Sequence, residues 1–378
     1  MSLIWEKKKL EEVCHKIFAG GDKPKDHFSN TKSNFFSIPV VSNGEKNNGI
    51  SGYTNLPTVS QEAITVSARG TIGFTVHRKY PFVPIVRLIV LIPNQEHISC
   101  EYIYYYLKSI DIDRTGTSIP QLTVPMIKKY SIPTPPLPEQ KQIVETLNKA
   151  FEKIDKAIAN MERNIENAEE LFKSKAKEIF NQNGSSYNQM TLGDIGKVSM
   201  CKRILKKETN TTGGIPFYKI GTFGKKANAY ISKKTYEDYR KKYSFPKKGD
   251  VLISASGTIG RRVIYDGEPA YFQDSNIVWI DNNELKVLNN YLYHFYGICE
   301  WNPSKGATIS RLYNDDLRRI RISFPNKEMQ SKLVKQLVSL KQLSDSLYSD
   351  YIKKLNNLKE LKKSILEKAF KGELTSAA

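Results

Sequence analysis

The sequence predicts an α+β protein: two mixed α/β globular domains separated by a pair of long antiparallel coiled-coil helices, with an internal pseudo-twofold repeat. Three observations predict this fold class. A long apolar stripe with helical spacing occurs twice, a set of short motifs recurs in order, and short strand-like runs end in glycine turns. The 378 residues suffice for two or three domains with hydrophobic cores of their own.

The first stripe follows residues 139–180, where apolar side chains recur every three or four residues. About forty residues at ~1.5 Å each make a helix of roughly 60 Å, which cannot bury its apolar side alone. A second stripe of the same spacing, over residues 333–369, supplies a partner within the chain. The irregular steps predict an imperfect coiled coil. Antiparallel pairing is natural because each helix begins at its own domain.

Motifs of the first half return in the second half at a nearly constant distance. Ser-Ala-Arg-Gly-Thr-Ile-Gly at 67–73 returns 187 residues later as Ser-Ala-Ser-Gly-Thr-Ile-Gly at 254–260. Gly116, Ile119 and Leu122 return 190 residues later as Gly306, Ile309 and Leu312. The chain is therefore a tandem duplication with four predicted segments: a globular domain at 1–136, a helix at 137–183, a second globular domain at 184–325, and a second helix with the C-terminal tail at 326–378.

Each globular half mixes short strands and helices. We expect strands at 63–67 and 250–255 that run into the glycine turns, further strands at 87–92 and 276–280, and tyrosine-rich helices after them. The rings of these helices fit core packing better than base stacking. Residues 132–138 predict a stiff connector, and Pro138 is expected to be the first residue of the first long helix. Asn326 is expected to cap the second long helix. Residues 181–188 predict a flexible link to the second globular domain.

The formal net charge of +19 comes from 58 Lys and Arg residues against 39 Asp and Glu residues. It favours a polyanionic partner, most simply nucleic acid, although solubility or an AT-rich genome also produces Lys-rich composition. The four cysteines show no paired spacing, so we expect reduced thiols in a cytoplasmic protein, without disulfides or a metal site. We expect no membrane segment, because no long apolar run or signal peptide occurs.

The doubled Gly-Thr-Ile-Gly turn, the doubled Gly-x-x-Ile-x-x-Leu segment and Ile-Pro-x-Pro-Pro-Leu-x-Glu-Gln at 132–140 resemble the specificity (S) subunit of type I restriction–modification systems. The resemblance covers essentially the whole chain. It implies two target recognition domains, each reading one half of a bipartite double-stranded DNA sequence. The two globular halves differ apart from the shared motifs, which favours an asymmetric target. The resemblance also implies two adenine-N6 methyltransferase subunits as partners, which bind S-adenosylmethionine themselves, and restriction/translocase subunits in the full complex. The chain itself would need no cofactor.

Candidate DNA contacts are basic or amide side chains in loops, because Arg pairs with guanine, Asn and Gln pair with adenine, and Lys, Arg and Thr contact phosphates. The glycines of the two turns either serve only to allow positive φ or also bring Thr and backbone N–H groups to a phosphate. The candidates are Lys46, Asn47, Asn48, Arg69, Thr71, Arg114, Gln121, Lys202, Arg203, Lys225, Lys226, Asn228, Thr258, Arg261, Arg262, Lys305 and Arg311.

The resemblance also implies that the long helices dock the methyltransferase subunits. The residues that we predict for this docking surface are Gln140, Ile143, Leu147, Ile154, Met161, Gln330, Leu333, Leu337, Leu347 and Leu358.

Catalytic motifs are not recognisable. The sequence has no methyltransferase cofactor loop and no adenine-binding Asn/Asp-Pro-Pro-aromatic motif, and its five histidines show no ligand spacing. Asp274 with Glu284 and Lys286 only loosely imitates a nuclease metal site. We therefore predict a non-catalytic DNA-recognition subunit. Two alternatives stay open: a stand-alone DNA endonuclease, and a coiled-coil scaffold that binds nucleic acid nonspecifically.

Overall fold

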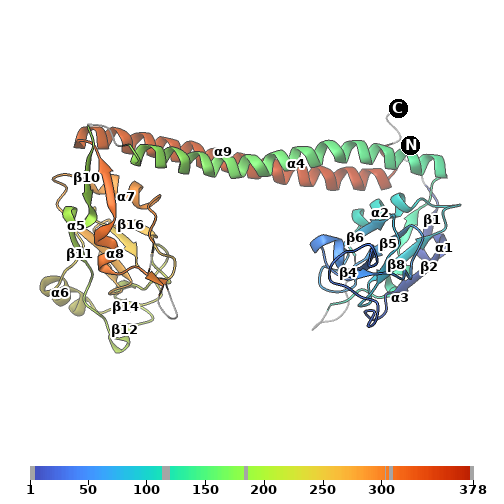
Figure 1. Cartoon of the computed structure of the whole chain (residues 1–378), viewed down its shortest axis with the longest axis horizontal. Helices are drawn as coiled ribbons and strands as arrows, with labels where there is room; N and C mark the ends of the chain where they lie inside the picture. Colours follow the sequence, from blue (N-terminus) through green and yellow to red (C-terminus); the bar gives the residue numbers. More distant parts are fainter. Residues whose placement is uncertain (1–4, 113–119, 183–185, 303, 306–309, 375–378) are drawn as a thin grey trace. The chain divides into compact units, whose positions relative to one another are not determined.

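The computed structural model describes residues 5–112, 120–182, 186–302, 304–305 and 310–374. The chain forms two compact units: unit 1 comprises Met1–Glu162 and Lys353–Ala378, and unit 2 comprises Arg163–Ile352. Helices α4 (Leu137–Phe180) and α9 (Lys327–Phe370), shown in Figure 1, are each divided between the two units, and each has its longer part in the unit where it begins. Among the described helices, none is long and apolar enough to cross a membrane.

Unit 1 is built on a four-stranded antiparallel sheet with the strand order β2-β8-β5-β6. A second sheet, β4-β3-β7, contains the parallel pair β3–β7, and β1 pairs with β9. The elements are β1 (Lys7–Lys9), α1 (Leu10–Val13), β2 (Cys14–Ala19), β3 (Ile38–Val41), η1 (Lys46–Gly49), β4 (Ile50–Thr54), β5 (Ala63–Val66), β6 (Thr75–Arg78), β7 (Val83–Pro84), β8 (Ile89–Pro93), α2 (Cys100–Ser109), α3 (Val124–Lys128) and β9 (Ser131–Pro133).

Unit 2 repeats this plan, with a sheet of order β11-β18-β15-β16 and a second sheet in which β13 and β17 are parallel. Its elements are β10 (Asn188–Thr191), α5 (Leu192–Ile195), β11 (Gly196–Ser199), η2 (Lys206–Glu208), β12 (Thr209–Asn210), β13 (Ile215–Tyr218), β14 (Tyr230–Ile231), α6 (Lys233–Lys242), β15 (Val251–Ser254), β16 (Arg262–Ile264), β17 (Tyr271–Phe272), β18 (Ile277–Asn282), α7 (Asn289–Tyr296), β19 (Ser304–Lys305), β20 (Ser310–Arg311), α8 (Asn314–Arg319) and β21 (Arg321–Phe324).

The predicted duplication is confirmed at the level of strand order. The short helices α1 and α5 stand before the first strand of each main sheet, and α2 and α7 follow its last strand. Helix α6 belongs to unit 2 and has no counterpart among the described residues of unit 1. The two units therefore share one frame, which is the four-stranded main sheet with the short helix before it and the tyrosine-rich helix after it. They differ in the elements that are added to this frame, such as α6.

The two long helices pack together within each unit. In unit 1, Ile143 and Leu147 near the start of α4 share a core with Leu366 and Ala369 near the end of α9. In unit 2, Ile179 near the end of α4 shares a core with Leu333 and Leu337 near the start of α9. The helices are therefore antiparallel, as the two stripes predict.

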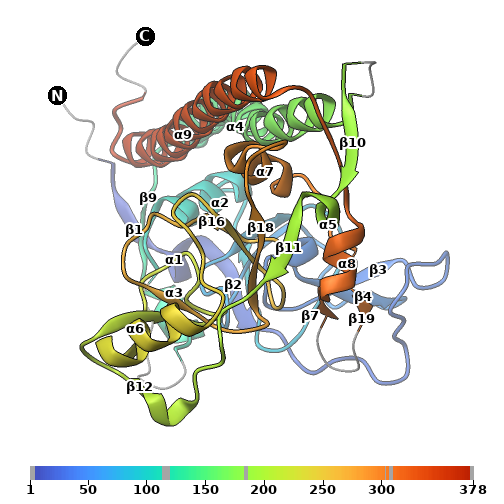
Figure 2. The ribbon, with the colours of Figure 1, turned by 90° about the vertical axis from the view of Figure 1, so that its left-hand side faces the viewer.

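The tyrosine-rich helices fill the space between sheet and helix pair, as Figure 2 shows for α7. Tyr102 of α2 has its ring 5.1 Å from that of Phe370, and Tyr291 of α7 has its ring 4.8 Å from that of Phe180. Both tyrosines are completely buried. These two rings are not available as a stacking platform for bases. The expected core role is confirmed for the buried rings that follow them in these helices, which are Tyr105, Tyr106, Phe295 and Tyr296.

The connectors largely match the expectation. β9 overlaps the start of the predicted extended segment, and α4 begins at Leu137, so Pro138 is its second residue and not its first. Asn326 caps α9, because its Oδ1 accepts a hydrogen bond of 2.9 Å from the Met329 N–H. The predicted flexible link falls partly outside the described residues and leads into β10 at Asn188.

Candidate nucleic-acid interface

The two Gly-Thr-Ile-Gly turns have the same backbone conformation. Gly70 and Gly73 have φ of +67° and +89°, and Gly257 and Gly260 have +65° and +82°. Each turn is closed by a 3.0 Å hydrogen bond, from Gly73 N–H to the Ser67 carbonyl and from Gly260 N–H to the Ser254 carbonyl. The predicted positive φ is confirmed. Thr71 and Thr258 are exposed in the turns, and their contact with a phosphate stays a prediction.

A second segment lies beside each turn and is held by one backbone hydrogen bond. Leu122 N–H donates to the Ala68 carbonyl and Leu312 N–H donates to the Ala255 carbonyl, both over 2.9 Å. These bonds place Gln121 and Arg311 next to the turns. The structure thus brings together candidates that lie about fifty residues apart in the sequence.

In unit 1 the turn is tied to two loops by a residue that sequence reasoning missed. Asn43 accepts a hydrogen bond from Ala68 N–H on its Oδ1 and donates from Nδ2 to the Val86 carbonyl, both over 2.7 Å. Val86 and the exposed Arg87 have positive φ of 55° and 60°, a conformation that β-branched and bulky residues rarely adopt. The Asn-Gly pair at 43–44 is the sequence signal that marks this turn.

The loop with Lys46, Asn47 and Asn48 is exposed, and both asparagines have φ of 51°. Arg78, which sequence reasoning also missed, supports it from inside. Its side chain is 1% exposed and donates from Nη2 to the Asn48 carbonyl over 2.7 Å and from Nε to Thr65 Oγ1 over 2.9 Å. Burial lowers the pKa of Arg78. Because a buried charge needs hydrogen-bond partners, the Arg78 guanidinium holds the Asn48 carbonyl, and with it the exposed loop, in place.

In unit 2, two predicted residues line one cavity of about 410 Å³, Arg203 and Arg311. Other polar residue types that suit base recognition line it too, among them Gln273, Asp274 and Asn276. Figure 1 shows β12 and β14 at the end of unit 2 away from the helix pair, and Thr209 of β12 also lines the cavity. Sequence reasoning missed Gln273 and Asn276 because no motif marks them.

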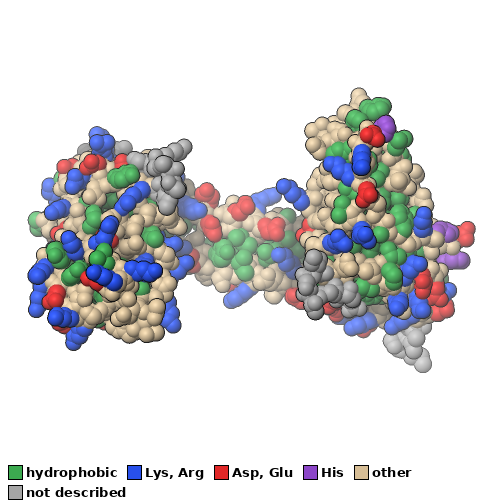
Figure 3. Space-filling view, turned by 90° about the horizontal axis from the view of Figure 1, so that it is seen from below, with side chains coloured by type: hydrophobic (Ala, Val, Ile, Leu, Met, Phe, Trp, Pro, Cys, Tyr) green, Lys and Arg blue, Asp and Glu red, His purple; other side chains and the backbone are tan. Residues whose placement is uncertain are grey.

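The remaining basic candidates of unit 2 lie elsewhere. Lys202, Lys226 and Asn228 are exposed, whereas Lys225 lines a different cavity. Lys and Arg side chains are spread over the face of unit 2 opposite α4 and α9 (Figure 3). A distributed positive surface of this kind suits phosphate contacts.

Arg261 and Arg262 are engaged within unit 2. Arg261 donates from Nη1 to the Phe223 carbonyl over 3.0 Å, and the Arg262 guanidinium lies 4.6 Å from the ring centre of Tyr293. Burial lowers the pKa of Arg262. A DNA contact of these two side chains stays a prediction. Arg114 lies outside the described residues, and Lys305 is described only through its backbone in β19.

The predicted docking residues on the helices need a correction. Seven of them are buried in the cores of this chain, so they cannot contact a partner subunit from where they lie: Gln140, Ile143, Leu147, Ile154, Gln330, Leu333 and Leu337. The apolar stripe correctly predicted that the two helices pack together, but its buried residues do not form a surface for partner subunits. Met161, Leu347 and Leu358 are partly exposed, and the large exposed apolar side chains of the helices are Leu171, Met329, Val338, Leu343, Tyr348 and Leu361.

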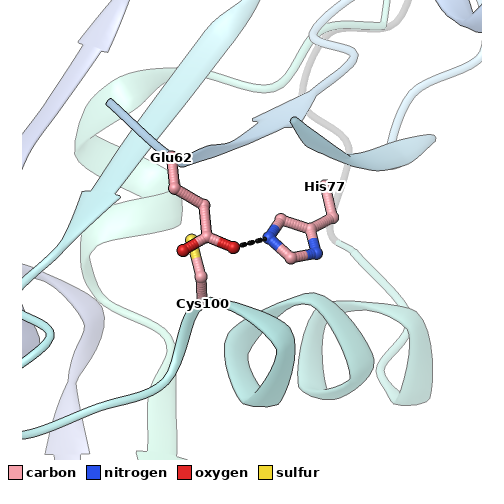
Figure 4. A group of neighbouring side chains, drawn as sticks. All are labelled: Glu62, His77 and Cys100. Carbon is pink, nitrogen blue, oxygen red and sulfur yellow. Dashed lines mark hydrogen bonds and ion pairs between the residues drawn. The ribbon is translucent and has the colours of Figure 1, made fainter. Parts of the chain in front are cut away.

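One group of potential metal ligands occurs among the described residues: Glu62, His77 and Cys100 (Figure 4). His77 Nε2 lies 2.5 Å from Glu62 Oε1, closer than the roughly 3.3 Å that separates two tetrahedral zinc ligands. Unit 2 has a polar group at the start of the corresponding helix, where Asn289 Nδ2 donates to Asp250 Oδ1 over 3.4 Å. We therefore interpret Glu62 and His77 as a hydrogen-bonded pair that lies beside Cys100 at the start of α2.

The carboxylates considered for nuclease chemistry are engaged separately. Asp274 Oδ2 accepts a hydrogen bond of 2.9 Å from Arg203 Nε, and Glu284 Oε1 accepts one of 2.7 Å from the Asn289 N–H. Neither carboxylate belongs to a group of potential metal ligands among the described residues. This arrangement offers no support for the endonuclease alternative.

Comparison with known proteins agrees with the duplicated frame. A family model described as type I restriction modification DNA specificity domain matches residues 4–167 and 184–359. The putative type I restriction enzyme specificity subunit S.HindORF215P of Haemophilus influenzae is 44% identical over 263 residues, 68% of either chain. The Escherichia coli EcoBI specificity subunit is 22% identical over 355 residues, 84% of this chain and 75% of that protein.

Two solved structures show a similar fold. One chain, from a study of complex assembly and conformational transition of the type I R-M system, gives a TM-score of 0.74 at 19% identity and 98% coverage of both chains. The HsdS subunit from Thermoanaerobacter tengcongensis gives a TM-score of 0.58 at 18% identity, covering 98% of this chain and 97% of that one.

Two copies of a DNA specificity domain, each joined to a long helix, define the class as a tandem DNA-specificity protein. The chain belongs to the specificity subunits of type I restriction–modification systems. It is a non-catalytic subunit that carries no cofactor of its own, as the resemblance in the sequence implies.

Proposed function

We propose that this chain reads a bipartite, asymmetric double-stranded DNA sequence, with unit 1 reading one half and unit 2 the other. The observation that carries this proposal is one frame with two unlike surfaces. The glycine turn and its neighbouring segment recur in both units, whereas α6 and the cavity beside Arg311 belong to unit 2. Equal frames would place both surfaces in comparable positions on DNA, and unlike surfaces would read unlike bases.

The charge of the chain supports phosphate contacts around these surfaces. The net charge is +19, and the candidates Lys46, Arg69, Lys202, Arg203 and Lys226 are exposed. Such residues position a protein on the duplex without reading sequence. Base recognition then depends on the few side chains that the frame holds rigidly.

The exposed sides of α4 and α9 would dock two adenine-N6 methyltransferase subunits. Leu171, Leu343 and Leu361 are each about half exposed, at 50%, 54% and 47%, and lie on these helices. The methyltransferases would bind S-adenosylmethionine, flip one adenine in each half-site and methylate it. Restriction/translocase subunits would join the same assembly.

Domain exchange tests the proposal. Residues 1–136 are replaced by the corresponding segment of another specificity subunit, and methylated adenines are mapped in cells that carry the chimera and the methyltransferase. We expect one half of the recognised sequence to change and the other half to stay. The matched chimera at 184–325 should change the opposite half. A change in both halves after either exchange would contradict separate reading by the two units.

A further inference from the structure

The segment beside each glycine turn places different side chains in the same structural position. Leu122 and Leu312 are both buried, and their N–H groups bond to equivalent carbonyls of the turn over 2.9 Å. The residue before each leucine therefore has the same backbone setting in both units. It is Gln121 in unit 1 and Arg311 in unit 2, and both are partly exposed.

In unit 2 the arginine is held in a fixed orientation. Arg311 Nη2 donates to the Ser275 carbonyl over 2.9 Å, and Ser275 is a non-glycine residue with φ of 55°. A guanidinium carries five N–H donors, and this bond uses one of them. Because strained backbone persists only where surrounding contacts maintain it, the Ser275 conformation is a built feature of this site.

The cavity beside Arg311 is preorganised on its other sides as well. Asn276 Oδ1 accepts a hydrogen bond of 2.7 Å from Ser256 Oγ, and Gln273 Oε1 accepts one of 2.9 Å from the Ile220 N–H. Asp274 is paired with Arg203 over 2.9 Å. Since Arg311 and these neighbouring side chains are already oriented, a ligand would bind in the cavity with little loss of side-chain conformational entropy.

In unit 1 the same position carries an amide that an arginine orients. Arg69 of the turn donates from Nη2 to Gln121 Oε1 over 3.4 Å, which favours one of the two amide orientations. The residue equivalent to Arg69 in unit 2 is Ser256. The arginine and the uncharged polar residue have thus exchanged places between the two repeats.

We infer that positions 121 and 311 are equivalent base-reading positions, Gln121 selecting adenine in one half-site and Arg311 selecting guanine in the other. The inference rests on the proposed function and names the bases of that same site. Its chemistry is bidentate pairing in the major groove, where Arg donates twice to guanine O6 and N7 and Gln pairs with adenine N6 and N7. A lysine ammonium can also donate to guanine, but it lacks the planar fork that fixes both hydrogen bonds.

Selection from a randomised duplex pool tests the inference, with the full chain assembled with its methyltransferase subunits. The variants are Arg311→Gln, Arg311→Lys and Gln121→Arg. Arg311→Gln should shift one position of one half-site from guanine towards adenine, with guanine preference falling about 5- to 150-fold. Gln121→Arg should make the converse change in the other half. Arg311→Lys should weaken the guanine preference, because the planar fork is lost, and should keep the affinity for random DNA.

The matched control is Arg318→Gln, an exposed residue of α8 paired with Asp315, which should leave the selected sequence unchanged. Thermal unfolding of each variant separates misfolding from altered reading, and Arg311→Lys keeps the test valid if Arg311→Gln does not fold. An unchanged motif with uniformly weaker binding in Arg311→Gln would mean a phosphate contact and would overturn the inference, while the proposed function stands. A wild-type complex without sequence preference would overturn both.

Discussion

Gln140 and Gln330 show how closely the two repeats agree at single residues. Each amide nitrogen donates to the proline carbonyl that precedes the helix over 2.8 Å, Pro135 for Gln140 and Pro325 for Gln330. Each amide oxygen accepts a backbone N–H just before the tyrosine-rich helix, from Ser99 over 2.9 Å and from Leu288 over 2.8 Å. Both side chains are completely buried. They fix where each long helix leaves its globular region.

Replacement of Gln140 by alanine should therefore destabilise unit 1. The change removes three hydrogen bonds and leaves backbone groups of Ser99, His97 and the buried Pro135 without these partners. We expect a loss of about 2–4 kcal/mol in unfolding free energy, measured by urea denaturation. Gln142→Ala, two residues further on an exposed side of α4, is the control and should change stability by less than about 0.5 kcal/mol. Equal effects of both changes would refute the anchoring role.

At the scale of elements, apolar packing rather than polar contact holds α4 against α9. Lys362 Nζ pairs with Asp155 Oδ1 over 2.6 Å in unit 1, but the aspartate side chain is more than half exposed, at 57%, and such pairs contribute little. Ser344 Oγ donates to the Ala168 carbonyl over 2.7 Å in unit 2 and brings the two backbones close together. The buried leucines and aromatic rings supply most of the stabilisation.

Truncation of a buried leucine of this helix pair should be costly. Leu337 is 0% exposed in the core that it shares with Ile179 of α4. Leu337→Ala should lower the unfolding free energy of unit 2 by about 2–5 kcal/mol, through lost apolar burial and the cavity that remains. Differential scanning calorimetry measures the effect. The neighbouring Val338, 40% exposed, gives the control Val338→Ala, and a comparable loss there would argue against the assigned core face.

The sequence was sufficient for the elements that have a strong period or a repeated motif. The spacing of α4 and α9 predicted both helices, and the doubled turn predicted the positive φ of Gly73 and Gly260. Sequence periodicity identifies an apolar side but not what covers it, so buried residues such as Leu147 were assigned to partner docking. The parallel pairing of β3 with β7 was not foreseen either.

The candidate site was predictable only where residue type and loop context coincide. Arg203 and Arg311 were identified in this way and share one cavity. Arg78, Asn43 and Asn276 were missed because each acts through contacts with residues distant in the sequence. Arg78, for example, holds the Asn48 carbonyl from thirty positions away. Such contacts depend on strand pairing that no local pattern specifies.

For the whole molecule, the charge predicts a steep salt dependence of DNA binding. With six to ten phosphate contacts, affinity should fall about 10³- to 10⁵-fold between 50 and 200 mM salt. Fluorescence anisotropy of the assembled complex measures this slope. Lys226→Gln, which removes an exposed cation of unit 2, should reduce the slope by about one, whereas Lys335→Gln on α9 should not. A slope near zero would exclude phosphate contacts as the main source of affinity.

The core of unit 1 contains Leu366 and Ala369, whereas every residue of unit 2 lies in one continuous stretch, Arg163–Ile352. During translation, the downstream globular region therefore has all its parts while the upstream one still awaits the last turns of α9. Domains usually finish folding in the order in which they leave the ribosome. We expect this polypeptide to reverse that order, so a stop codon shortly before Leu366 should yield a product whose second half is native and whose first half is open to proteases.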